Sequence, residues 1–218
     1  MSGLWPWLTL FGLGAFHGIN PGMGWLFAVA LGLQERSRRK VLAALPPIAV
    51  GHALSIGIVA ALVWAAQASL PDRALRYGSA TILFGFGLYR LLRARHPTWV
   101  GMRVGFRDLV LWSFLMASAH GAGLMLVPVL LGWSQGHDGH HGSHTGSLTP
   151  QQIIAALDPL RWLAAVLVHT LGHLLVATLI ALLVYEKLGL ALLQRAWFNL
   201  DLLWVIALML SGVLILIL

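Results

Sequence analysis

The sequence contains no cysteine. A chain without thiols forms no disulfide, binds no metal through thiolate and passes no electrons through a dithiol pair. Charge is scarce as well, since only 10% of the 218 residues are Asp, Glu, Lys or Arg, against about 25% in soluble domains. No phosphate-binding glycine loop with Lys and no HExxH motif is present. We therefore expect no enzyme activity and no ATP-driven step in this chain.

Apolar residues make up most of what is there. They account for 59% of the chain, and the mean hydropathy is +0.83. A helix needs about 20 mostly apolar residues to cross a bilayer. Six apolar runs can be counted, at 4–33, 41–66, 77–92, 109–133, 162–185 and 198–218. The sequence thus predicts an all-α integral membrane protein with six transmembrane helices and the lipid bilayer as its main partner.

The basic residues predict the orientation of these helices. Eleven lie in the connections on one side of the predicted membrane: Arg36, Arg38, Arg39, Lys40, Arg90, Arg93, Arg95, Arg103, Arg107, Lys187 and Arg195. Only Arg73, Arg76 and Arg161 lie on the other side. The positive-inside rule then places both termini in the periplasm of a bacterial inner membrane. Because this distribution accounts for the net charge of +7, we expect no nucleic-acid partner.

Two halves of the chain, 1–95 and 96–218, resemble each other. Gly51-His52 opens the segment GHALSIGIVAALV in the second helix of the first half, and Gly172-His173 opens the similar segment GHLLVATLIALLV in its counterpart. His17-Gly in the first helix matches His120-Gly in the fourth. Since each half has three helices, the second half enters the membrane from the opposite side, as in the inverted repeats of transporters. The alternative is that short Gly, Ala and Leu matches arise by chance in membrane helices.

Five histidines lie inside the predicted spans: His17, His52, His120, His169 and His173. Polar side chains in a membrane usually face the bundle interior or a cavity, and no acidic residue lies at a span centre. Imidazole favours Ni, Co, Zn, Cu and Fe over Mg or Ca. We interpret the histidines as candidate metal residues, whereas a helix–helix hydrogen bond is the alternative for each one alone. His169 has no counterpart in the other half, which favours packing for this residue.

The first helix carries residues that break helices. The segment 17–24 reads His-Gly-Ile-Asn-Pro-Gly-Met-Gly. Proline removes a backbone donor, and irregular backbone at membrane depth is tolerated only inside protein or beside a cavity. Asn20 and Met23 are therefore further candidate ion contacts. Pro128 predicts a weaker break in the fourth helix. A simple packing kink is the alternative at both places.

The longest predicted outer loop, 134–161, is rich in histidine, glycine and serine. Its histidines are His137, His140, His141 and His144. They could collect metal on the periplasmic side, or the loop could be a solvated linker that binds metal only incidentally.

These features together resemble the lysine-exporter superfamily. The shared features are three plus three helices, a His-Gly before a Pro-Gly break, its echo in the fourth helix, and a His-rich loop. Within the superfamily, the chain is most similar to nickel/cobalt exporters and to hydrogenase/urease accessory permeases. The resemblance implies metal contacts at His17 and His52, and at His120 and His173. It departs from the nickel/cobalt pattern after Pro21, where Gly22 and Met23 replace an acidic residue and a second histidine. Thiol–disulfide carriers of the superfamily need two cysteines, which this chain lacks.

The expected function is a secondary transporter of a divalent transition-metal cation, coupled to an ion gradient such as that of protons. The metal is then substrate, and no permanently bound cofactor is expected. Three alternatives stay open. They are an exporter of an amino acid or other small organic solute, a haem-binding membrane electron carrier, and a factor that delivers metal to a metalloenzyme. Homo-oligomerisation and an assembly partner also stay open.

Overall fold

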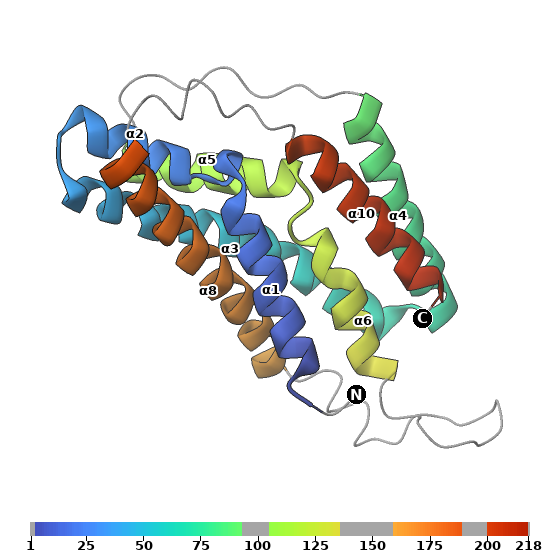
Figure 1. Cartoon of the computed structure of the whole chain (residues 1–218). Coiled ribbons are helices and arrows are strands. Elements are labelled where there is room, and N and C mark those ends of the chain that lie inside the picture. Colours follow the sequence, from blue (N-terminus) through green and yellow to red (C-terminus); the bar gives the residue numbers. More distant parts are fainter. Residues whose placement is uncertain (1–2, 93–104, 136–158, 189–199, 218) are drawn as a thin grey trace.

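The computed structural model describes residues 3–92, 105–135, 159–188 and 200–217 (Figure 1). All regular secondary structure in these ranges is helical, so the all-α prediction is confirmed. The eight α-helices are α1 (Trp5–Ile19), α2 (Trp25–Gln34), α3 (Arg38–Ser69), α4 (Asp72–Leu92), α5 (Phe106–Ala119), α6 (Val127–Gln135), α8 (Pro159–Leu183) and α10 (Leu200–Ile217). Short 3-10 turns η1 (Pro21–Met23) and η2 (Leu124–Leu126) and a π-helical turn η3 (Val184–Leu188) complete them.

The first apolar run is divided into α1 and α2 at the segment that sequence identified. Asn20 ends α1 in an extended conformation with φ −70° and ψ 120°, and its side-chain oxygen accepts a hydrogen bond from Gly22 N at 2.8 Å. Gly24 then takes φ +119°, which disfavours any side chain. The Trp25 indole N–H donates to the Ile19 carbonyl at 3.1 Å, which satisfies one acceptor that the break leaves open.

The fourth apolar run is also interrupted. Helix α5 ends at Ala119, Gly121 takes φ +69°, and the chain resumes through η2 into α6. The segments Phe106–Ala119 and Leu124–Leu131 are bent by 52° with respect to each other. Both first helices of the predicted halves are therefore broken, and each break contains one glycine in the left-handed region.

Two helices in the described ranges are long and apolar enough to cross a membrane. They are Arg38–Gln67 and Pro159–Lys187, with mean hydropathies of 2.1 and 2.2. The bent pair α5–α6 makes a third if it is one span. This composition is compatible with a membrane protein.

The exposed face of α8 consists of leucine at every fourth position. The residues are Leu163, Leu167, Leu171, Leu175, Leu179 and Leu183, each between 48% and 60% exposed. At a rise of about 1.5 Å per residue the row covers about 30 Å, the thickness of a bilayer's hydrocarbon core. His169 and His173 of the same helix are fully buried. Helix α8 thus presents leucine to its surroundings and places two histidines in an otherwise apolar buried face.

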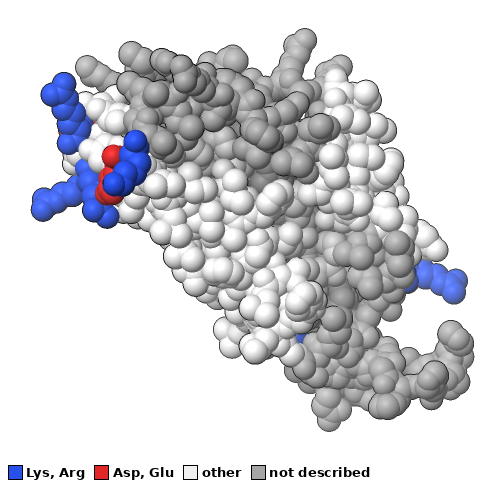
Figure 2. Space-filling view, in the orientation of Figure 1, with Lys and Arg blue, Asp and Glu red and all other residues white. Residues whose placement is uncertain are grey.

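Charged side chains are separated along the molecule. On the face shown in Figure 2, described Lys, Arg, Asp and Glu residues lie at its ends, with uncharged surface between them. At the α2–α3 end, Lys40 pairs with Glu35 at 3.1 Å and Arg38 with Glu186 at 3.2 Å. All four side chains are more than 40% exposed, so these pairs add little stability. Their position marks a polar end of the molecule.

Several helix pairs join the first predicted half of the chain to the second. Helix α1 packs along α8, and α5 packs along α3. Helices α4 and α10 form a third pair at one side of the molecule, and α3 also contacts α8 (Figure 1). Each of these four contacts therefore joins a helix of one half to a helix of the other.

Glycine makes the α1–α8 contact close. A Cβ atom at Gly14 would overlap the His169 carbonyl, and one at Gly18 would lie 2.6 Å from the His173 carbonyl oxygen. From the other side, a Cβ at Gly172 would overlap the Phe11 carbonyl. Backbones approach this closely only where small residues face each other. These three glycines therefore hold α1 against the histidine-bearing face of α8.

The α4–α10 pair is secured at one end by an arginine. Arg76 donates from Nε to the Ile215 carbonyl at 2.8 Å and from a terminal nitrogen to the Leu216 carbonyl at 2.9 Å. These carbonyls belong to the last turn of α10, which has no intrahelical donor for them. Arg76→Gln is expected to lower the local stability of α10 by about 1 kcal/mol, measured as faster amide hydrogen exchange in its last turns. Arg73→Gln, an exposed neighbour on α4, is the control; equal exchange in both variants would contradict this role.

Candidate functional site

Four histidine side chains from three helices meet in the protein interior. His17 comes from α1, His52 from α3, and His169 and His173 from α8; all four are 0% exposed. The ring centre of His17 lies 5.6 Å from that of His52 and 4.9 Å from that of His169. His52 lies 5.5 Å from His169 and stacks on His173 at 4.0 Å. We call these four residues the histidine cluster.

Hydrogen bonding identifies the reactive nitrogen of His17. Its Nδ1 lies 2.7 Å from the Leu13 carbonyl oxygen. A carbonyl can only accept, so Nδ1 carries the proton of the neutral ring and the lone pair lies on Nε2. Metal-binding histidines commonly donate their second ring N–H to a backbone carbonyl in this way, which fixes tautomer and orientation. His17 therefore has the local arrangement of a nitrogen ligand.

The other rings of the cluster are less constrained. Among the described residues, neither ring nitrogen of His52 has a hydrogen-bond partner. The carbonyls of Leu10 and Met23 lie beside His169 and His173, but no bond to these rings has full hydrogen-bond geometry. A buried polar group without a partner is costly. The histidine cluster is thus an energetically costly feature of the fold.

His120 lies near the histidine cluster. It follows the last residue of α5, and its Nδ1 lies 2.8 Å from the Met116 carbonyl. This bond repeats the one between His17 and the carbonyl four residues before it. His120 also acts electrostatically on His17, and its Cε1 would lie 3.8 Å from a Cβ at Gly22. The fourth-helix histidine thus faces the break of the first helix.

The break itself contributes two buried residues beside the cluster. Asn20 is 4% exposed and Met23 is 1% exposed. Because Gly22 N–H can only donate, the Asn20 oxygen is the accepting atom, and the orientation of the amide is determined. Its Nδ2 has no hydrogen-bond partner among the described residues. The segment between α1 and α2 therefore presents a fixed, unsatisfied donor in the interior.

Ring spacing within the cluster matches a shared ion, whereas ring orientation does not. Two imidazoles bound to one tetrahedral ion at metal–nitrogen distances of about 2.0–2.1 Å would have centres about 5 Å apart. His17, His52 and His169 have centres 4.9 to 5.6 Å apart. Yet no three His, Asp or Glu side chains in the described ranges direct their donor atoms at one point. The positions of the three rings fit an ion, but their rotations do not.

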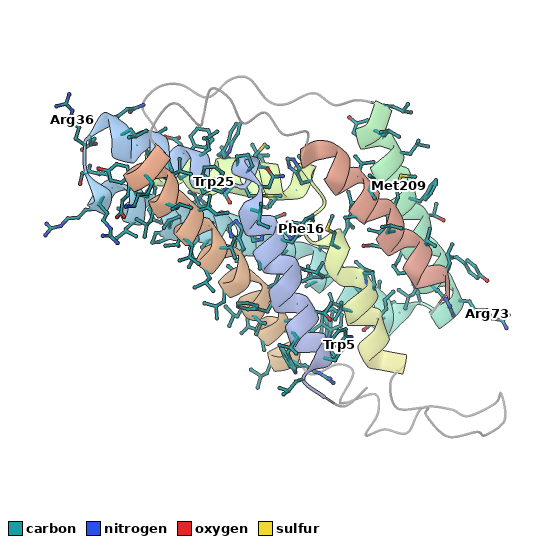
Figure 3. The ribbon with its side chains drawn as sticks, viewed as in Figure 1. Trp5, Phe16, Trp25, Arg36, Arg73 and Met209 are labelled. Atoms are coloured by element: carbon teal, nitrogen blue, oxygen red, sulfur yellow. The ribbon has the colours of Figure 1, made fainter. Side chains whose placement is uncertain are left out.

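The histidine cluster lies near the middle of the molecule. Figure 3 places Phe16, adjacent to His17 in sequence, near the middle of the molecule, between Arg36 at one end and Arg73 at the other. The histidines of the cluster act electrostatically on one another, and His120 acts on His17.

The sequence pattern favoured a packing role for His169, and the contact made by the glycines of α1 was not predicted. His169, which lacks a counterpart in the other half, contacts both His17 and His52. The Gly14-x-x-x-Gly18 spacing is typical of close helix pairs. It could have predicted that α1 packs closely against another helix. The metal roles of His17, His52, His120, His169, His173, Asn20 and Met23 remain predictions.

Two further sequence features carry no argument here. The loop histidines His137, His140, His141 and His144 lie outside the described residues. The segment 132–136 has the spacing GxSxG, but Ser134 lies within α6. That motif works only at a strand-to-helix turn, which exposes the serine oxygen.

No protein-family model matches this sequence, and no curated protein or solved structure matches it either. The resemblance to the lysine-exporter superfamily therefore rests on the quoted motifs alone and stays a prediction.

Proposed function

We propose that the protein is a secondary membrane transporter of a transition-metal cation, which binds at the histidine cluster. The observation that carries the proposal is the meeting of four buried imidazoles from α1, α3 and α8. Imidazole is a ligand for Zn, Cu, Ni and Fe, and buried polar groups without partners are rare unless they serve function. His17, His52 and His169 would bind the ion after rotation of their rings, with His173 and His120 beside them.

The proposed architecture is six transmembrane helices in two inverted halves, 1–95 and 96–218. Helix α1 packs on α8, and its counterpart α5 packs on α3, the counterpart of α8. These reciprocal contacts support the proposed architecture, because a two-fold relation between the halves produces them. Matching breaks after α1 and α5 support it as well. Transporters of this kind hold substrate near the membrane midplane, beside discontinuous helices. The proposed location is a bacterial inner membrane with periplasmic termini.

Transport in this scheme uses no ATP. The metal is substrate, and its gradient or a proton gradient drives movement. Histidine can exchange a bound ion for a proton because both occupy the same nitrogen lone pair. The two broken helices supply positions where the backbone can bend during transport. Release of the ion and protonation of the rings would then alternate.

A second candidate is export of a small organic solute such as an amino acid. The unpartnered Asn20 Nδ2 favours it, because this donor would suit a carboxylate or carbonyl oxygen better than a cation. The candidate leaves the four histidines without a direct role. Competition for flux by organic solutes rather than by metals would distinguish it.

Ion flux into proteoliposomes tests the proposed function. The protein would lack residues 136–144, so that binding to the His-rich loop cannot imitate transport. We expect flux of at least one ion from a panel of Ni, Co, Zn, Cu, Mn and Fe, and a loss of about 100-fold or more in His17→Ala. Ser211→Ala, in α10 away from the cluster, should transport normally. Absence of flux for every metal in both orientations would refute the proposal and favour an organic solute.

A further inference from the structure

We propose that the histidine cluster is one half of a two-fold site whose other half carries no imidazole at the corresponding places. In this arrangement His52 and His173 lie on the axis that relates the two halves of the chain. Two pairs of side chains correspond across the axis, namely His17 with Met116 and His169 with Ile48. The inference rests on the proposed function and deepens it, because it assigns one ion to each chain and names the residues that exclude a second.

The α1–α8 and α3–α5 interfaces contain the same contact at equivalent glycines. A Cβ atom at Gly172 would overlap the Phe11 carbonyl of α1, and one at Gly51 would overlap the Val110 carbonyl of α5. Gly51 and Gly172 each precede the histidine of a Gly-His pair, so they correspond in the two halves. Phe11 of α1 therefore corresponds to Val110 of α5.

A second contact in each interface has the same register. Gly14, three residues further along α1, faces the His169 carbonyl, which a Cβ atom at Gly14 would overlap. Ser113, three residues further along α5, donates its hydroxyl to the Ile48 carbonyl at 2.7 Å. His169 and Ile48 each lie three residues before the equivalent glycine of their own helix. His169 of α8 therefore corresponds to Ile48 of α3.

This register differs by about one helical turn from the one that the histidine motifs predicted. His17 lies three residues after Gly14, and Met116 lies three residues after Ser113, so these two residues correspond. His120, which the motifs paired with His17, lies four residues beyond Met116, and a turn of helix contains about 3.6 residues. His120 therefore lies at the end of α5, beside the break of the first helix.

His52 and His173 have the geometry expected of residues beside such an axis. Each follows one of the equivalent glycines, so the two-fold operation exchanges them. Their rings stack with centres 4.0 Å apart and an angle of 11° between the ring planes. Equivalent side chains meet in this way where a two-fold axis passes between them. The pair is therefore shared by both sides of the axis.

The places that flank this pair differ between the two sides. On the α1–α8 side, the His17 and His169 rings have centres 4.9 Å apart. On the α3–α5 side, Ile48 is 0% exposed and has no lone pair, while Met116 is 2% exposed and has a weakly accepting sulfur. The Ile48 side chain also fills its place, since a Cβ atom at Gly24 would lie 2.7 Å from the Ile48 Cγ2 atom. The ion therefore binds on the α1–α8 side.

Moving the ligands across the axis tests the inference. The variant His17→Ala/His169→Ala removes the binding side, and the further changes Met116→His and Ile48→His rebuild it on α3 and α5. Flux of Zn²⁺, Ni²⁺, Co²⁺ and Cu⁺ is measured in proteoliposomes that contain the full chain, so the His-rich loop is identical in all samples. We expect the first variant to lose about 100-fold in flux, and the rebuilt variant to recover to within about tenfold of the original chain.

The matched control adds two buried histidines at places that do not correspond to the cluster. It carries Leu45→His and Met125→His in the same His17→Ala/His169→Ala background; Leu45 and Met125 are 3% and 2% exposed. The control should not recover flux. Recovery in the control as well, or no recovery in a rebuilt variant that folds, would overturn the inference and leave the proposed transporter intact.

Metal content provides a second measurement that does not require the rebuilt variant to fold. Equilibrium dialysis compares bound metal in the original chain and in His17→Ala/His169→Ala. We expect a difference of about one ion per chain. A difference of two ions would show that both sides of the axis are occupied and would overturn the inference. No flux in the original chain would refute the proposed function, and this inference with it.

Discussion

Replacing Gly14 by Leu is expected to prevent α1 from packing on α8. A Cβ atom at this position already overlaps the His169 carbonyl, and that atom belongs to rigid helix backbone. The side chain cannot be accommodated by a rotamer change, so the helices must separate. We expect a loss of more than about 3 kcal/mol in the free energy of unfolding, seen as low yield of folded protein and a lower melting temperature in detergent.

Gly12→Leu is the matched control for this prediction. Gly12 lies one half-turn away in α1, and nothing lies within 4 Å of a Cβ there. Both substitutions add the same side chain to the same helix and remove one glycine from it, so helix propensity cancels. Gly12→Leu should retain the yield and melting temperature of the original chain. Equal effects of the two changes would show that the α1–α8 contact is not the cause.

Replacing His52 by Leu is expected to abolish transport while leaving the fold at least as stable. His52 is fully buried, and neither ring nitrogen has a hydrogen-bond partner among the described residues. Leu removes this desolvated polar group and fills a similar volume. We expect the free energy of unfolding to stay constant or rise by about 1 kcal/mol. Metal flux in proteoliposomes should fall about 100-fold, because a ligand is lost.

Ser113, at the interface between α5 and α3, provides a contrast to His52. Ser113, 1% exposed, donates its hydroxyl to the Ile48 carbonyl at 2.7 Å and joins α5 to α3. Ser113→Ala should reduce stability by about 1 kcal/mol and leave flux intact. A histidine that serves only packing would behave like this serine. A marked loss of stability in His52→Leu would therefore support the packing interpretation and contradict the ligand role.

If the protein lies in a membrane as proposed, the trade-off between stability and transport expected at His52 follows from its lipid surroundings. Rows of exposed leucine on α8 are suited to lipid, so polarity is concentrated inside the bundle. In lipid, the interior is where an ion can be desolvated and held. A cluster that is costly for the free protein is therefore expected to be stabilised by its substrate, and added metal should raise the melting temperature in proportion to affinity.

Sequence by itself determined the helical class, the two breaks and the histidines that merit attention. These are local properties: apolar composition predicts helices, Pro21 lacks a backbone donor, and glycine readily adopts the positive φ found at Gly24. Only the tertiary structure decided which histidines meet. His169 joins His17 and His52 because Gly14 and Gly18 allow α8 to approach α1 closely, whereas His120 caps α5 beside Gly22. Contacts of this kind depend on how two helices that are far apart in the sequence cross each other. The crossing is determined by which residues of the two helices face each other, and the sequence alone does not show these pairs.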